Sequence, residues 1–136
     1  MERGANVPSM SPLRLLTGHE LEFIRLGHAI VLGFSGDRHV IIEAPAHLDG
    51  PDGRVDIEPD DPSDAIGTLL GDVVREARAG EAGELRISFV SGAELLVDAD
   101  AFAESWAVAG PDGFLIVCLA RGELAMWGAA SGELCR

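Results

Sequence analysis

The sequence predicts a mainly β protein with antiparallel sheets of about nine strands, arranged as two similar halves, and one short helix. Two observations support this prediction: apolar residues alternate with a period of two over many short segments, and Gly, Pro, Asp and Ser separate these segments. The chain has 136 residues, of which 47% are hydrophobic, so it is long enough to bury one core.

The domain boundaries follow from composition. Pro8 and Pro12 stand among Gly, Asn and Ser, so residues 1–12 are predicted to form a flexible leader. Residues 13–136 are predicted to form a single β-rich domain, with halves at about 18–60 and 71–128.

The first half begins with two strands that are separated at Gly27. Their apolar residues are spaced two apart, at Leu21 and Phe23 and then at Ile30, Leu32 and Phe34. A turn-rich tetrad at 35–38 precedes the β-branched run Val40–Ile42. Residues 30–43 are therefore predicted to form a hairpin.

Residues 49–64 have a different character, because three prolines and seven carboxylates accompany a single arginine. This composition predicts an exposed loop. Asp61 and Pro62 suit the start of a helix, so a short helix is expected over Pro62–Leu70 before Gly71. Its buried stripe would contain Ile66, Leu69 and Leu70.

The second half repeats this order of elements. Val73 and Val74 begin a strand, Leu85, Ile87 and Phe89 alternate with polar residues, and a further strand returns over 95–97. Residues 30–43 and 85–98 align without a gap, although only Phe34 and Phe89 are identical, and Gly-Pro-Asp-Gly occurs at both 50–53 and 110–113. The shared order favours an internal duplication, while the general similarity of hairpins is the alternative.

The last third predicts a three-stranded meander over 106–109, 114–119 and 124–127, because such short connections join antiparallel neighbours. This region resembles the C-terminal signature of a small uncharacterised protein family found mainly in actinobacteria. The matching residues are Trp106, Gly110, Pro111, Asp112, Gly113, Cys118, Gly122, Leu124, Ala125 and Trp127. The resemblance implies a fold and a lineage but no activity.

Charge limits the classes of partner. Ten basic residues, all Arg, oppose 23 acidic residues, and the net charge is −13. Direct nucleic-acid binding and attachment to anionic membranes are therefore disfavoured, since both depend on cationic residues. Two cysteines and no signal-peptide pattern lead us to expect a cytoplasmic protein.

Catalytic and metal-binding patterns are not recognisable in the sequence. His19, His28, His39 and His47 lack the spacing typical of zinc ligands. Cys118 lies in an apolar strand, where core packing is expected, and no nucleophile elbow is present. We therefore expect a non-enzymatic protein without a metal or cofactor.

The leading hypothesis is an acidic interaction protein that recognises a basic protein partner, for example as an immunity protein or antitoxin. Complementary charge would accelerate encounter with that partner. The candidate steering charges are Asp49, Asp52, Asp56, Glu58, Asp60 and Asp61. Trp106 and Trp127 would anchor the interface if exposed, although core packing is the simpler expectation for both.

Two other hypotheses remain open. One is a ligand-binding protein or enzyme with a pocket between the sheet halves, where His39 or Arg86 would supply polar groups. The other is a homodimeric structural module that pairs through an edge strand or the C-terminal meander.

Overall fold

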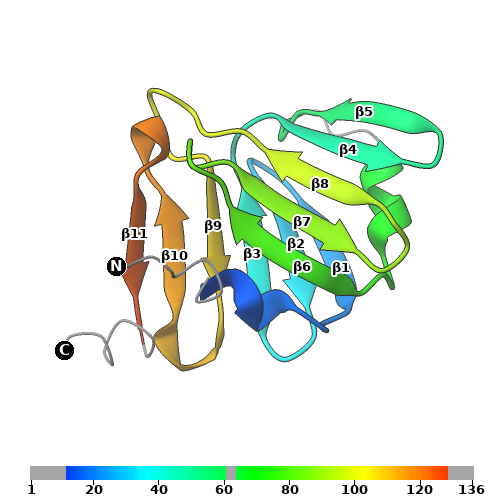
Figure 1. Ribbon diagram of the computed structural model, residues 1–136, viewed down its shortest axis with the longest axis horizontal. Coiled ribbons are helices and arrows are strands. Elements are labelled where there is room, and N and C mark those ends of the chain that lie inside the picture. Colours follow the sequence, from blue (N-terminus) through cyan, green and yellow to red (C-terminus); the bar gives the residue numbers. More distant parts are fainter. Residues whose placement is uncertain (1–11, 61–63, 129–136) are drawn as a thin grey trace, which may run out of the picture.

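The computed structural model describes residues 12–60 and 64–128 and contains eleven β-strands in two antiparallel sheets (Figure 1). The six-stranded sheet has the order β1-β2-β3-β9-β10-β11 and the five-stranded sheet the order β5-β4-β8-β7-β6. The strands are β1 (Leu21–Leu26), β2 (Ile30–Phe34), β3 (Arg38–Ile42), β4 (Ala46–Gly50), β5 (Gly53–Ile57), β6 (Val74–Ala79), β7 (Leu85–Phe89), β8 (Glu94–Val97), β9 (Trp106–Ala109), β10 (Leu115–Cys118) and β11 (Leu124–Trp127). Four short 3-10 helices accompany them within these described residues: η3 (Pro12–Leu16), η4 (Asp64–Leu69), η5 (Pro111–Gly113) and η6 (Ala120–Gly122).

The sheets bury a shared core between them. Strands β6–β8 lie across β1–β3, while β9–β11 and β4–β5 extend on opposite sides (Figure 1). Alternate residues of each strand point inward, and Ile30, Leu32, Leu85, Ile87 and Trp106 are all fully buried. The mainly β prediction is therefore confirmed, and so are the hairpin of β2 and β3 and the meander of β9–β11.

The prediction of an exposed acidic loop is wrong for residues 49–57. Strands β4 and β5 form a hairpin there, which raises the strand count from about nine to eleven. Leu48 and Ile57 are buried while neighbouring charged residues face solvent. The alternation is thus present, but a high density of Asp and Pro obscured it.

The helix predictions need two corrections. The predicted helix Pro62–Leu70 is instead the 3-10 helix η4, which buries Ile66 and Leu69 but leaves Leu70 51% exposed. The expected capping residues Asp61 and Pro62 lie outside the described residues. Of the predicted leader, residues 1–11 also lie outside them, whereas Pro12 begins η3.

The two halves share detailed geometry. Helix η3 buries Leu13 and Leu16, and η4 buries Ile66 and Leu69 at the equivalent positions. The first strand of each half then carries a register shift near its start, between Leu21 and Phe23 in β1 and between Val74 and Glu76 in β6. In both halves, the residue before this shift pairs with an equivalent phenylalanine, Phe34 or Phe89.

The halves also exchange strands. The β4–β5 hairpin of the first half pairs with β8, and β9 of the second half pairs with β3. Reciprocal hydrogen bonds join the halves where Gly18 N donates to Val74 O and Gly71 N donates to Leu21 O, both at 2.8 Å. Each half therefore completes the sheet of the other.

Candidate functional site: two outer sheet faces

The outer face of the five-stranded sheet is a polar ladder. Two rows of side chains cross it, because residues paired between neighbouring strands lie on the same side of a sheet. One row is Asp56, His47, Leu96, Arg86 and Arg78, and the other is Arg54, Asp49, Glu94, Ser88 and Glu76. This face thus carries both acidic and basic groups.

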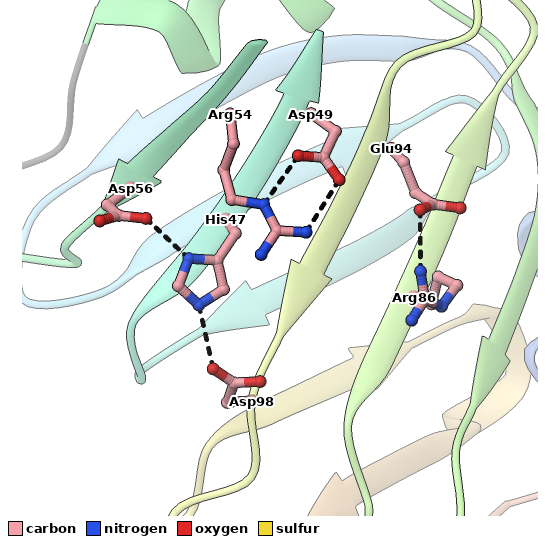
Figure 2. Close-up of polar contacts among 7 residues, drawn as sticks. All are labelled: His47, Asp49, Arg54, Asp56, Arg86, Glu94 and Asp98. Carbon is pink, nitrogen blue, oxygen red and sulfur yellow. Dashed lines mark hydrogen bonds and ion pairs between the residues drawn. The ribbon is translucent and has the colours of Figure 1, made fainter.

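His47 lies between two carboxylates (Figure 2). Its Nδ1 is 2.8 Å from Asp56 Oδ1 and its Nε2 is 3.0 Å from Asp98 Oδ2. Both carboxylates accept hydrogen bonds, so together they favour the doubly protonated ring. The hydrogen bond with Asp56, followed by that with Asp98, raises the pKa of His47 above 6.5.

Other charges of this face are paired as well. Arg54 donates two hydrogen bonds to Asp49, at 2.8 and 3.0 Å, and this pairing lowers the pKa of Asp49 (Figure 2). Arg86 donates to Glu94 at 2.8 Å, and Ser88 Oγ donates to the second oxygen of that carboxylate. The polar ladder is therefore largely neutralised by its own contacts.

Five of the six predicted steering residues are described by the structure, and they differ in their contacts. Asp49 and Asp56 are held by Arg54 and His47 within the ladder. Asp52 lies in the turn between β4 and β5, while Glu58 and Asp60 are exposed beyond β5. Asp61 lies outside the described residues. Asp49 and Asp56 thus lie in two separate contacts of the ladder, with Arg54 and with His47.

The outer face of the six-stranded sheet has the opposite character, and we call it the apolar face. It also consists of two rows across the sheet. One row is Phe23, Gly33, His39, Ala109, Leu115 and Trp127, and the other is Arg25, Val31, Ile41, Ala107, Val117 and Ala125. None of these positions carries a carboxylate, and all except Gly33 retain solvent-accessible surface.

Phe23 covers part of the neighbouring strand at the β1 edge of the apolar face. An added Cβ at Gly33 would lie 2.1 Å from the Phe23 ring, which shows that this ring lies directly over the glycine. Arg25 stacks over the same ring, with Cζ 5.6 Å from its centroid, and His39 is also a neighbour of Phe23. Glycine is needed here because any side chain would displace the ring.

Sequence reasoning missed the apolar face, although a signal for it was present. Antiparallel strands that bury one face alternate apolar and polar residues, as Leu85, Arg86, Ile87 and Ser88 do. In contrast, β2, β9 and β10 are continuously apolar. Continuous apolar strands in an antiparallel sheet indicate that both faces of the sheet contact apolar groups, or that the outer face can bind an apolar surface.

The two tryptophans have different positions. Trp106 is fully buried and donates from Nε1 to Gly83 O at 2.9 Å, so it belongs to the core and not to a surface. Trp127 is 50% exposed at the β11 edge of the apolar face. Cys118 is buried beside Trp106, and burial raises the pKa of its thiol.

His39 and Arg86 do not converge on one pocket. His39 lies on the outer face of the six-stranded sheet and Arg86 on that of the five-stranded sheet, with the apolar core between them. Within residues 12–60 and 64–128, no group of three or more His, Cys, Asp or Glu could hold a metal ion. Over the same residues, no helix is both long and apolar enough to span a bilayer.

Comparison with known proteins gives one match. The model of a family of unknown function, DUF6188, matches residues 12–128. No curated protein and no solved structure matches the chain.

Proposed function

Because the chain belongs to DUF6188, a family whose function is unknown, we propose its function from the geometry: it is a non-enzymatic protein that binds a basic protein partner. The observation that carries the proposal is the exposed apolar face of the six-stranded sheet. Large exposed apolar patches typically mark interaction sites. Inhibition of a cationic toxin, as by an immunity protein or antitoxin, is one specific form of this function.

The size of the apolar face suits an interface centre. Strands about 4.8 Å apart and residues about 3.3 Å apart give an area of about 400 Å² for six strands of four residues. A stable interface buries about 800 Å² on each partner. The apolar face can therefore supply the centre, and a polar rim must supply the rest.

The rim of this face is acidic. At one end of the strands, Asp37 and Asp112 occupy exposed turns, and at the other end Glu43, Glu104 and Glu123 are exposed. A second copy of the chain would place carboxylates opposite carboxylates, which is unfavourable. A partner with an apolar patch surrounded by Arg or Lys would instead match both the centre and the rim.

The test compares one substitution on each sheet. Leu115→Arg places a charge on the apolar face, whereas Leu96→Arg makes the same change in the polar ladder of the other sheet. Immobilised wild-type protein is incubated with extract of the source cells at low and high salt, and retained proteins are identified by mass spectrometry. We expect wild-type protein and the Leu96→Arg variant to retain the same basic protein, and the Leu115→Arg variant to lose it. Retention of this protein should fall as the salt concentration rises.

Two results would contradict the proposal. One is that no basic protein shows this dependence on Leu115. The other is a stable dimer in light scattering that Leu115→Arg dissociates, because the apolar face would then bind a second copy.

A further inference from the structure

A hollow of about 380 Å³ lies at the end of the five-stranded sheet, away from the apolar face. It is bounded by the β4–β5 turn, η4 and the β7–β8 turn, which lie together at the right of Figure 1. Its lining residues include Gly50, Thr68, Asp72, Ser91 and Ala93. Since the two halves share their geometry, the first half contains an equivalent place.

The register identifies the equivalent residues. Ala93 corresponds to Arg38, because Ala93 is hydrogen-bonded to Phe89 as part of the β7–β8 turn and Arg38 pairs with Phe34. Thr68 corresponds to Leu15, because each directly precedes the last buried leucine of its 3-10 helix. Asp72 corresponds to His19, since each follows the glycine that ends this segment.

In the first half this place is filled. An added Cβ at Gly110 would lie 2.6 Å from Leu15 Cδ1, so the leucine side chain packs directly against this glycine. The guanidinium group of Arg38 lies alongside and donates from Nε to Leu15 O at 2.7 Å and from Nη1 to Gly36 O at 2.7 Å. The chain thus supplies its own cation here.

In the second half both filling side chains are replaced by shorter ones, Thr68 and Ala93. The carbonyl of Thr68 is equivalent to the Leu15 carbonyl that Arg38 contacts. Neither Gly71 N nor Asp72 N donates a hydrogen bond to it. Gly71 N donates to Leu21 O and Asp72 N donates to Leu69 O instead. The replacement therefore leaves both a space and an acceptor.

Asp72 adds a negative charge to this space. Its carboxylate accepts hydrogen bonds from Val73 N, Ser91 N and Ser91 Oγ, which fix its orientation. Among residues 12–60 and 64–128, no ion pair to a cationic side chain is formed by Asp72. The equivalent position in the first half is His19. The carboxylate is therefore present only in the half whose hollow is unfilled.

We infer that this hollow binds a guanidinium group supplied from outside the chain, in the place that Arg38 occupies in the first half. Thr68 O would accept a hydrogen bond from it and Asp72 would provide the countercharge. An arginine side chain of a protein and a free guanidinium compound share this chemistry. The inference concerns a different surface from the apolar face and does not depend on the proposed function.

The experiment follows amide chemical shifts by NMR during titration with methylguanidinium, with free arginine, and with a short peptide that contains one arginine. The same peptide with lysine is the ligand control. We expect saturable shifts at Thr68, Asp72, Ser91 and Ala93 for guanidinium ligands, and at least tenfold weaker binding of the lysine peptide. Binding of the peptide alone would identify a protein arginine, whereas equal binding of free arginine would identify a small molecule.

Three variants test the site. Ala93→Arg and Thr68→Leu restore the side chains of the first half and should abolish the shifts, while Asp72→Asn should weaken binding at least tenfold. Ala101→Arg adds the same charge at an exposed position and should bind like the wild type. The inference is overturned if no guanidinium ligand binds below 10 mM, or if binding survives in a folded Ala93→Arg or Thr68→Leu variant.

Discussion

The His47 contacts predict a measurable dependence of stability on pH. The ring lies between Asp56 and Asp98 at 2.8 and 3.0 Å, and its side chain is 23% exposed. Both carboxylates are more than half exposed, so solvent screens each contact. Exposed ion pairs contribute about 0.2–1 kcal/mol each, and the two together should stabilise the fold by about 1 kcal/mol.

The direction follows from the raised pKa of His47. The stabilisation is complete below the unfolded pKa near 6.5 and is lost as the pH rises through the higher folded value. In thermal unfolding, His47→Gln should therefore lower the melting temperature by about 4 °C at pH 5.5 and by much less at pH 9.

The control is His28→Gln, which alters an exposed histidine between β1 and β2. It should leave the pH dependence of the melting temperature unchanged. If His47→Gln lowers the melting temperature equally at both pH values, the two carboxylates do not stabilise a charged ring and the reasoning is wrong.

Three further predictions concern the core. Gly83→Ala should lower the free energy of unfolding in urea by about 3 kcal/mol, because φ is +89° and the added Cβ would lie 2.4 Å from Gly122 Cα. Gly92→Ala, with φ of +102° and no atom within 4 Å, should lose only about 1 kcal/mol, and equal losses would exclude a steric role for Gly122. Trp106→Phe should cost about 2 kcal/mol, because it removes the hydrogen bond to Gly83 O; an unchanged urea midpoint would contradict this. Cys118 should resist alkylation at pH 8 until the protein unfolds, since burial raises its pKa, and peptide mapping that finds it modified in the native protein would disprove this.

Much of the fold was predictable because alternation is a local property. Leu85, Ile87 and Phe89 identify β7 and its buried side without any knowledge of the neighbouring strands. The same rule failed for β4 and β5, where charge and proline content outweighed the buried positions Leu48 and Ile57. It also left the apolar face unnoticed, because the period-two spacing of Ile30, Leu32 and Phe34 describes only the buried side of β2.

The candidate sites were less predictable, since they depend on contacts between distant segments. His47 meets Asp98 across 51 positions of sequence, and no spacing motif marks such a pair. Likewise, the hollow becomes visible only when Thr68 and Ala93 are compared with Leu15 and Arg38 in an equivalent structural place.

The sequence by itself determined the β class, most of the strands, the tight turns and the excess of negative charge. Only the tertiary structure decided that the halves exchange strands and that one half contains the space which the other fills with Arg38. It also decided that one outer face is apolar while the other is neutralised by its own ion pairs. The physical reason is that alternation specifies which side of a strand is apolar. Which strands become neighbours depends on the packing of residues far apart in the chain.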